Sequence, residues 1–442
     1  MVRTFQVGLL GLGTVGCGVA HILQTNQDVI RERLGAGIEL ARVADLDLDR
    51  PRWVEVDRER MTTNAQEVVK DPEIEIVVEL IGGYEPARSL LLQALEEGKH
   101  IVTANKALLA RNGSEIFEAA ARRGLDVGFE ASVGGGIPII RAIKEGFSAN
   151  RLRSISCIIN GTGNYILSKM TDEGRPFEEV LAEAQEKGFA EADPSFDVDG
   201  IDSAHKLAIL ATLAFGTHVP EEKVFTEGIR RIEPVDIEFA REFGYRIKLL
   251  AIAKEADGKV EVRVHPTMVP TTNILSTVDG VLNAVLVEGD AVGTTIFIGQ
   301  GAGSLPTASA VVGDIIDTCR NILTGAAGRV PALSYRLEAM RHLPISDVND
   351  TVTKYYLRIM ALDQPGVLSK VSGILGENDI SIASVIQRDR RKEGAVPVVL
   401  MTHHAREGSV QRALSAIDQL DVVAGPSMLI RVENNQASES AG

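Results

Sequence analysis

Two charged residues, Asp202 and Lys206, stand four positions apart at the start of the apolar run 207–215. On a helix that spacing puts both side chains on one face, and the face turns apolar after one turn. A charged pair in that setting predicts a partly dry cleft, where a lysine can exchange protons during catalysis. The spacing alone also fits an ordinary ion pair on a helix surface. Other features of the chain must decide between these interpretations.

A glycine-rich turn near the start of the chain indicates a nucleotide site. It follows an apolar strand expected over 4–10 and opens a helix, in the pattern G-x-G-x-x-G. In that context the first glycine permits the tight turn, the second lets the backbone approach a pyrophosphate, and the third allows close helix packing. A purely structural glycine turn is the alternative. The cofactor contacts expected in this turn are Gly11, Leu12, Gly13 and Gly16.

The choice between NAD and NADP stays open at this point. Asp45 follows the second expected strand and could accept the adenosine ribose hydroxyls. A carboxylate there disfavours a 2′-phosphate, whereas Arg50 and Arg52 just beyond it could bind one.

The order of expected elements predicts an α/β chain of several domains. Strands and helices alternate at first, as in a Rossmann-type doubly wound parallel sheet. An α+β region with a more antiparallel sheet follows, and then a compact βαββαβ unit of the ferredoxin-like type. The expected boundaries are 1–133 for the nucleotide-binding domain, 134–325 for the catalytic and dimerisation domain, 326–352 for a linker, 353–434 for the C-terminal domain and 435–442 for a disordered tail.

Within these domains three local expectations can be compared with a structure. The first helix is expected to run on to about Leu34. A helix is expected over 114–123, after the strand at 100–103. A helix near 307–323 is expected to pack back toward the nucleotide-binding domain.

Composition limits the classes of partner. The chain has 442 residues, a net charge of −15 and 4% aromatic residues, with no basic patch, so we expect a small-molecule substrate and no nucleic acid. No run approaches the roughly 20 apolar residues of a membrane helix, so we expect no membrane association. Cys17, Cys157 and Cys319 are isolated and odd in number, which favours a reducing compartment and a cytoplasmic location.

Together, these motifs and several others resemble homoserine dehydrogenases, and they occur in the order found in that family. The segment 363–368 and the residues 378–380 resemble an ACT domain, an amino-acid-binding regulatory module. The blocks that carry the dehydrogenase resemblance are 8–16, 78–83, 102–108, 130–138, 160–162, 191–206, 301–303 and 306–310.

The resemblance implies an NAD(P)-dependent oxidoreductase that interconverts L-aspartate 4-semialdehyde and L-homoserine, in threonine, methionine and isoleucine biosynthesis. It makes Lys206 the proton donor to the aldehyde oxygen and the base in the reverse direction. Lys106, after the strand at 100–103, matches a lysine near the nicotinamide and the substrate, so either lysine could carry the proton. Glu191, Asp197 and Asp202 match substrate-binding acids, which suit the ammonium group of homoserine.

The resemblance also implies further ligand contacts. Thr14, Val15, Gly188 and Gly303 match cofactor contacts. A monovalent-cation site, with sodium the expected ion, matches the loop residues Glu130, Val133, Gly135 and Ile137, mainly through backbone carbonyls. A simple glycine hinge between domains is the alternative for that loop. The triplet 160–162 either lines the substrate site or forms a turn after a buried strand.

For the C-terminal domain the implied effector is threonine, held at the helix N-terminus that follows 363–366. Such domains pair between subunits, so a homodimer or homotetramer is expected, and a purely oligomerising module is the alternative. Two rival functions remain. One is another amino-acid-related dehydrogenase, and the other is a cofactor-bound amino-acid sensor without catalysis.

Overall fold

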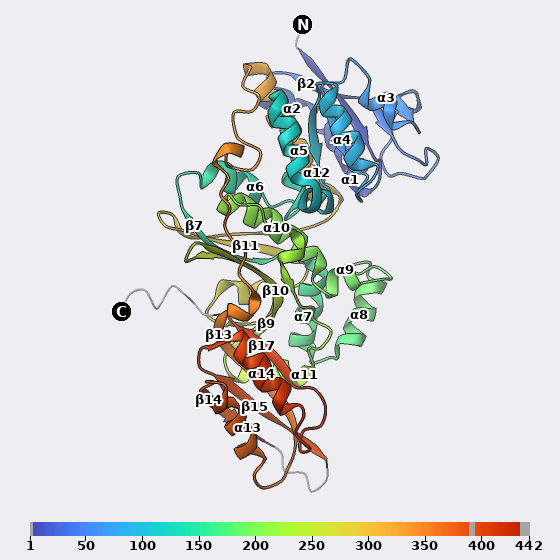
Figure 1. Ribbon diagram of the computed structural model, residues 1–442. Coiled ribbons are helices and arrows are strands. Elements are labelled where there is room, and N and C mark those ends of the chain that lie inside the picture. The colour runs from blue at the N-terminus through green and yellow to red at the C-terminus, as the bar shows by residue number, and fades with distance from the viewer. Residues whose placement is uncertain (1–2, 389–393, 434–442) are drawn as a thin grey trace. The chain divides into compact units, whose positions relative to one another are not determined.

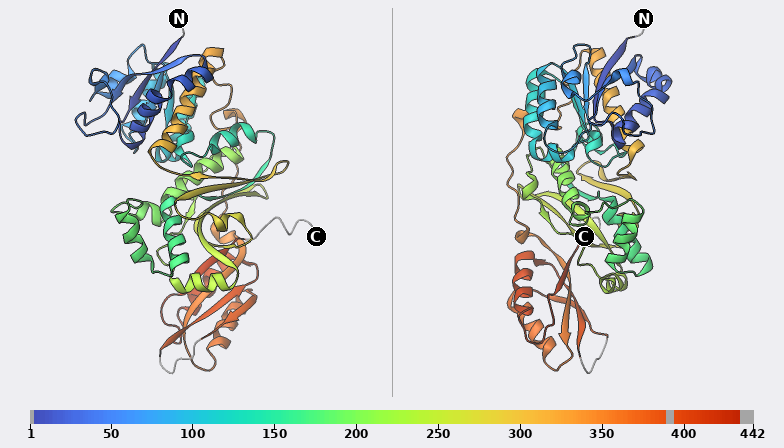
Figure 2. Two further views of the ribbon diagram at one scale, coloured as in Figure 1. Left: turned by 180° about the vertical axis from the view of Figure 1, so that it is seen from behind. Right: turned by 90° about the vertical axis from the view of Figure 1, so that its right-hand side faces the viewer.

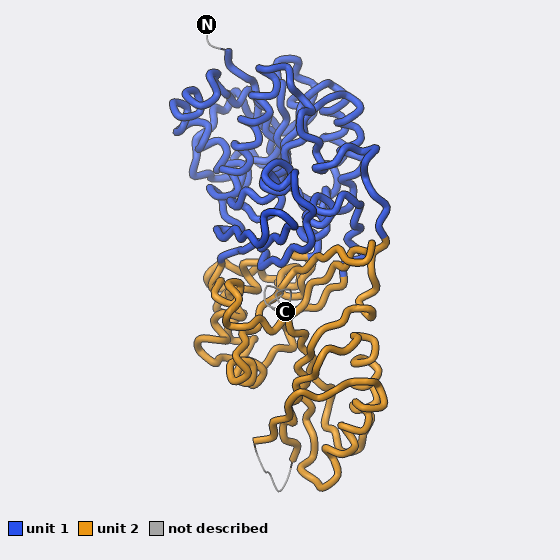
Figure 3. The backbone as a smooth tube through the Cα atoms, turned by 90° about the vertical axis from the view of Figure 1, so that its left-hand side faces the viewer, with its two compact units in different colours: residues 1–159, 204–224, 282–343 blue, residues 160–203, 225–281, 344–442 orange. Residues whose placement is uncertain are grey.

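The computed structural model describes residues 3–388 and 394–433 (Figure 1). The tail expected over 435–442 lies outside them. The chain divides into two compact units, drawn in different colours in Figure 3. Unit 1 comprises residues 1–159, 204–224 and 282–343, and unit 2 comprises residues 160–203, 225–281 and 344–442.

Unit 1 contains a six-stranded parallel sheet in the order β3-β2-β1-β4-β5-β6, the doubly wound arrangement. The central strand β1 is almost wholly buried and pairs with β2 on one side and β4 on the other. The strands are β1 (Thr4–Leu10), β2 (Gly37–Ala44), β3 (Met61–Thr62), β4 (Ile76–Glu79), β5 (His100–Thr103) and β6 (Val127–Gly128).

Helices cover both faces of this sheet. The right-hand view of Figure 2 shows α4 and α5 on one face, and α1 with the gold helix α12 on the other. α12 packs closely on α1, because Gly18 lets the backbone of α1 approach Ser304 and Ala308. The helices are α1 (Thr14–Thr25), α2 (Gln27–Leu34), α3 (Ala65–Val69), α4 (Ala87–Glu96), α5 (Lys106–Arg123) and α12 (Ser304–Thr324).

The rest of unit 1 is a small antiparallel sheet and two helical segments. β11 pairs with β12 and with β7, and the short helix α6 runs into a π-helical turn over Ala142–Gly146. α10 is one continuous helix whose residues 204–215 belong to this unit. The elements are β7 (Leu152–Ile158), β11 (Leu282–Gly289), β12 (Gly293–Gln300), α6 (Ile139–Arg141) and α10 (Ile201–Phe215).

Unit 2 is built on a mixed sheet in the order β9-β10-β17-β13-β15-β14. β9 and β10 form a long antiparallel hairpin, β17 joins β10 in parallel, and the short strand β8 pairs with the other part of β10. The elements that precede the C-terminal domain are α7 (Gly161–Glu173), α8 (Phe177–Glu186), α9 (Ser195–Val198), β8 (Phe225–Thr226), α11 (Pro234–Glu242), β9 (Tyr245–Ala256) and β10 (Lys259–Pro270).

The C-terminal part of unit 2 has the expected βαββαβ order. Its two helices lie side by side over a core that contains Tyr355, Leu400 and Val410 (Figure 1). The elements are β13 (Val352–Leu362), α13 (Val367–Glu377), β14 (Ile382–Ile386), β15 (Ala395–Thr402), β16 (Ala405–Arg406), α14 (Glu407–Ile417) and β17 (Met428–Val432). The predicted ferredoxin-like fold is confirmed.

Two local expectations were wrong in detail, and one strand was not expected. The first helix is broken at Asn26, so that α1 and α2 are separate. The helix expected over 114–123 begins at Lys106, where Asn105 caps it. The strand β12 was not expected at all. Among the described residues no helix has the length and apolar character needed to cross a membrane.

Candidate active site

The glycine turn between β1 and α1 has the geometry that its sequence predicts. Gly11 has φ +97°, and its amide donates to the carbonyl of Ala44 over 2.8 Å. A Cβ on Gly11 would lie 2.8 Å from the carbonyl oxygen of Leu80, and a Cβ on Gly16 would lie 2.2 Å from that of Gly11. Both positions therefore require glycine for close packing inside the protein.

Gly13 differs from these two glycines, because a Cβ there would meet no protein atom within 4 Å. Gly13 is the N-cap of α1 and supplies no side-chain cap. The first amides of α1 are thus left for a ligand, and a helix N-terminus with free amides attracts phosphate. Because Gly13 has no side chain, a phosphate can approach these amides.

Asp45 supports this turn from the end of β2. Its carboxylate accepts a hydrogen bond from the amide of Leu12 over 2.7 Å and pairs with Arg52 at 3.4 Å. Arg52 in turn donates to the carbonyl of Leu12 over 3.2 Å. Two of the three side chains whose charges bear on the choice between NAD and NADP, Asp45 and Arg52, therefore contact each other and the glycine turn.

Two further predicted cofactor glycines, Gly303 and Gly188, are not part of the glycine turn itself. Gly303 has φ +119° and is the N-cap of α12, and the next residue, Ser304, donates from its hydroxyl to the carbonyl of Thr14 over 2.6 Å. The 303 segment thus lies beside the glycine turn. Gly188, with φ +73°, follows α8 in unit 2.

Lys206 lies in the second turn of α10 and is 8% exposed. Its ammonium donates to the carbonyl oxygen of Ile159, just beyond β7, over 2.7 Å. Asp202, one turn earlier on the same helix, is 3% exposed. The predicted helical spacing is confirmed. The burial favours the proton-transfer interpretation over a surface ion pair, because a solvated pair would not be desolvated in this way.

Asn160 brings two of the predicted acids together. Its side-chain amide donates to Asp197 over 2.7 Å and to Asp202 over 3.0 Å, while its oxygen accepts from the amide of Gly163 and so caps α7. The sequence left open whether Asn160 belongs to a turn or lines the substrate site. In the structure Asn160 caps α7 and also contacts two of the predicted acids. The sequence could indicate the cap, because the contact from Asn160 to Gly163 spans only three residues. It could not indicate the contacts with Asp197 and Asp202, which lie 37 and 42 residues away.

The third predicted acid is more separate. Glu191 is exposed, and its backbone carbonyl accepts from the side chain of Gln185 over 3.0 Å. Its exposure contrasts with the burial of Asp202.

Lys106 is the first residue of α5, partly exposed, after the Asn105 cap. Asn105 accepts from the amide of Leu108 and donates to the carbonyl of Gly83 over 2.7 Å, which fixes the start of the helix. α5 and α10 lie together, since residues 109–117 and 208–212 line one small cavity. Lys106 on α5 and Lys206 on α10 each lie within about one helical turn before the residues that line this cavity.

The loop over 130–137 suits a cation that takes carbonyl ligands. Gly134 and Gly135 have φ +76° and +55°, and Gly135 packs so closely on Gly301 that a Cβ would lie 2.6 Å from its carbonyl. Among the described residues no hydrogen bond is donated to the carbonyl oxygens of Val133 or Gly135. The carbonyls of Glu130 and Ile137 each accept one backbone amide. Hard oxygen donors of this kind fit an alkali cation.

The side chain of Glu130 has a different role from its carbonyl, because it caps α6. Its carboxylate accepts from the amides of Ile140 and Arg141 over 2.7 and 2.8 Å. Burial, with the neighbouring Asp314 charge, raises the pKa of Glu130 to about 7. Burial likewise raises the pKa of Asp314 to about 6. Asp314 accepts from the Glu130 amide over 2.8 Å and so ties this loop to α12, a role without a signal in the sequence.

Comparison with known proteins extends these observations. Residues 138–316 match the family model described as "Homoserine dehydrogenase", residues 11–130 match "Homoserine dehydrogenase, NAD binding domain", and residues 355–422 match "ACT domain". A homoserine dehydrogenase of Pseudomonas aeruginosa is 48% identical over 98% of this chain and 99% of its own.

Two solved structures illustrate the range of similarity. A homoserine dehydrogenase from Thiobacillus denitrificans is 48% identical, covers 98% of this chain and 99% of its own, and has a TM-score of 0.93. A hyperthermophilic archaeal homoserine dehydrogenase in complex with NADPH is 26% identical, with a TM-score of 0.60 over 72% of this chain and 98% of its own.

Proposed function

Because the chain belongs to the homoserine dehydrogenase family, we propose that Lys206 is the group that exchanges a proton with the reacting oxygen of its substrate. The enzyme is an oxidoreductase that interconverts L-aspartate 4-semialdehyde and L-homoserine with a nicotinamide cofactor. Hydride transfer is the chemistry that the cofactor supplies when bound. The protein must therefore place a proton donor and orient the substrate.

The observation that carries this proposal is the buried hydrogen bond from Lys206 to Ile159. It fixes the ammonium beside the end of β7. In reduction, Lys206 gives one proton to the aldehyde oxygen as that oxygen becomes a hydroxyl. In the reverse direction the neutral amine takes the hydroxyl proton. Lys106 is the alternative proton carrier, and substitution of each lysine by alanine tests the two assignments.

Asp197 and Asp202 are proposed to hold the substrate ammonium, with Asn160 as the residue that positions them. The Asn160 amide contacts both carboxylates and so holds them near each other. Asp202 and Lys206 share α10, and one helical turn then separates the ammonium anchor from the proton donor. Glu191 is proposed as a third acid, from the family resemblance alone.

For the cofactor, residues 11–16 and Gly303 are proposed to hold the pyrophosphate and adjoining groups, with Asp45 and Arg52 near the ribose. The archaeal relative solved with NADPH supports NADP, and the Asp45 carboxylate supports NAD. For the cation, the proposed ligands are the carbonyls of Glu130, Val133, Gly135 and Ile137, with sodium as the ion. The free carbonyls of Val133 and Gly135 support it.

The ACT domain is proposed to bind threonine and to lower activity in response. Gly366 has φ +89° and is the N-cap of α13, so the first amides of that helix can receive an amino-acid carboxylate. A homodimer or homotetramer is proposed, because ACT domains pair between subunits. The three cysteines are free and buried, which supports a reducing, cytoplasmic setting.

Steady-state assays of the purified chain test these proposals together. L-homoserine is oxidised with NAD and with NADP in parallel, with and without threonine and with sodium replaced by choline. We expect homoserine-dependent cofactor reduction, inhibition by threonine and lower activity without sodium. Turnover of other hydroxy amino acids with equal efficiency would instead favour a broader dehydrogenase, and no turnover would favour a sensor.

A further inference from the structure

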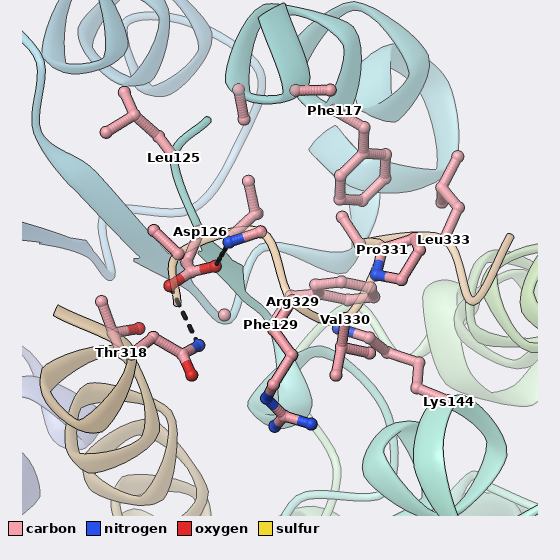
Figure 4. Close-up of a pocket in the computed structure, with 18 of the residues that line it drawn as sticks. Phe117, Leu125, Asp126, Phe129, Lys144, Thr318, Arg329, Val330, Pro331 and Leu333 are labelled. Carbon is pink, nitrogen blue, oxygen red and sulfur yellow. Dashed lines mark hydrogen bonds between the residues drawn. The ribbon is translucent and has the colours of Figure 1, made fainter. Parts of the chain in front are cut away.

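A cavity of about 510 Å³ lies within unit 1, apart from the residues assigned above to substrate and cofactor. It is enclosed by the end of α5, β6, the α6 segment, α12 and a strap that we define as residues 327–341 (Figure 4). The volume falls in the range of small-molecule sites. Its apolar walls come from both helix and strap, and include Phe117, Leu125, Phe129, Val330, Pro331 and Leu333.

The strap is held at both ends by hydrogen bonds. At one end the amide of Gly328 donates to Asp126 over 2.8 Å. At the other the Arg341 guanidinium donates to the carbonyl of Phe215 over 3.0 Å, and Tyr335 packs its ring on Gly216. The cavity is therefore a formed feature of the fold, and its cover also contacts the C-terminal end of α10.

Most charged groups on the cavity wall already have partners. Glu130 accepts two backbone amides, and Asp314 accepts a third and pairs with Arg141 at 3.5 Å. Arg329 pairs with Glu145 at 3.2 Å. Asp126 accepts from Gly328 and from Asn321. Asp317 lies 3.9 Å from Arg141, and Glu338 is an exposed acid of the wall.

Lys144 is one exception, and the exposed Arg336 is another. Lys144 extends from the π-helical turn into the cavity, and its ammonium lies 5.4 Å from the centre of the Phe129 ring (Figure 4). Within the part of the chain that the structure describes, no hydrogen bond or ion pair is formed by this ammonium. Burial lowers the pKa of Lys144, and this effect outweighs the opposite effect of the charges of Asp314, Glu130, Glu145 and Asp317.

We propose that this cavity binds a small organic monocarboxylate, whose carboxylate pairs with the Lys144 ammonium and whose apolar body contacts Phe117, Phe129 and the strap. The Lys144 ammonium is the cation that lies over the Phe129 ring among these apolar walls, and a carboxylate is the group that forms a short, charge-assisted hydrogen bond with an ammonium. The walls favour an aromatic or branched aliphatic body over a second charged group. The proposal does not depend on the roles assigned to Lys206 or the substrate acids.

The test uses 4-fluorophenylacetate as the probe and 4-fluorophenylacetamide as its neutral isostere, with binding to the full chain followed by fluorine NMR. We expect the acid to bind about tenfold or more tightly than the amide, the scale of one charged hydrogen bond. Lys144→Gln should remove that preference, and Lys144→Arg, which keeps the charge, should retain it. Lys223→Gln, at an exposed lysine of unit 1, is the matched control and should retain it.

Thermal unfolding of each variant shows that the fold is kept. Equal binding of acid and amide to the unaltered chain would overturn the proposal, as would the absence of binding by the acid. A preference for the acid that survives in Lys144→Gln would also overturn it, because the carboxylate would then lie at another cation.

Discussion

The ammonium of Lys206 donates a hydrogen bond to the carbonyl oxygen of Ile159, and the next residue, Asn160, donates its side-chain amide to Asp202. Two consecutive residues after β7 thus position a lysine and an aspartate that lie one turn apart on α10. A short stretch of chain can thus orient both the proposed proton donor and the proposed ammonium anchor.

The first prediction concerns Asn160. Asn160→Ala should raise the KM for homoserine about tenfold, because Asp197 and Asp202 lose the donor that holds them together. It should also cost about 1 kcal/mol of stability through the lost cap of α7. Asn64→Ala, which removes the equivalent cap of α3, is the control. Comparable KM values for the two variants would show that Asn160 acts only as a cap.

The second prediction separates two roles of glycine in the cofactor turn. Gly16→Ala should lower the free energy of unfolding, because its Cβ would lie 2.2 Å from the Gly11 carbonyl. Gly13→Ala should leave stability nearly unchanged, since its Cβ meets no protein atom, yet weaken cofactor binding by blocking the open helix end. Chemical denaturation and cofactor titration measure the two effects. Unaltered cofactor affinity in Gly13→Ala would place the phosphates elsewhere.

The third prediction concerns a buried ion pair between α11 and the ACT domain. Asp236 is 0% exposed, and Arg358 donates to its carboxylate over 2.7 and 3.0 Å. Arg358→Met should cost about 3–5 kcal/mol of unfolding free energy, because it leaves a buried carboxylate without its counterion. Arg388→Met, at an exposed pair with Glu238, should cost less than about 1 kcal/mol. Similar losses of unfolding free energy in Arg358→Met and Arg388→Met would contradict this prediction.

The fourth prediction is a pH effect at His265, which is fully buried. Its Nε2 accepts from Arg263 over 2.8 Å and its Nδ1–H donates to Pro266 over 3.0 Å, so the neutral ring fits. Burial, together with the charges of Arg431, Arg263 and Lys254, lowers the pKa of His265 well below 6.5. The unfolded chain therefore binds a proton that the folded chain excludes.

Stability due to His265 should thus be present above about pH 6.5 and fall as the pH drops below it, by up to about 1.4 kcal/mol per pH unit. Denaturation curves between pH 7.5 and pH 5 measure this slope. His265→Asn should reduce the slope, and His403→Asn, at an exposed histidine, should leave it as it is. A slope that does not change in His265→Asn would contradict the assignment.

The fifth prediction concerns the proposed threonine response. Gly366→Ala should raise the threonine concentration for half-inhibition, because alanine disfavours the left-handed conformation at the N-terminus of α13. Gly373→Ala, inside the same helix with open space around it, is the control. A local variant is preferable to removing the domain, since its loss would leave Asp236 without Arg358. An unchanged response in Gly366→Ala would place threonine elsewhere.

The sequence was informative wherever one local pattern determined one local structure. The strand, glycine turn and helix over 4–25 were predicted because periodicity and the need for positive φ at Gly11 act within a few residues. The start of α5 was missed because Asn112 and Gly113 read as a helix break. In the structure Gly113 lies in the helix, where its Cα packs on the Phe117 ring.

Features that depend on distant contacts could not be predicted. The strap looked like a linker because it has few periodic residues, yet it closes a cavity against Phe129 and Lys144, nearly 200 residues earlier. The pairing of Asn160 with Asp197 and Asp202 depends on how α7, α9 and α10 meet. Such side-chain relations require the three-dimensional fold.

The turnover number of Lys206→Ala in homoserine oxidation tests the central claim most directly. The account predicts a fall of about two orders of magnitude or more, the usual scale for a general acid–base group, with cofactor affinity little changed. Lys223→Ala, at the exposed lysine, should retain normal turnover. A turnover number for Lys206→Ala within a few-fold of the unaltered enzyme would contradict the account, and a hundredfold loss in Lys106→Ala alone would transfer the role to that lysine.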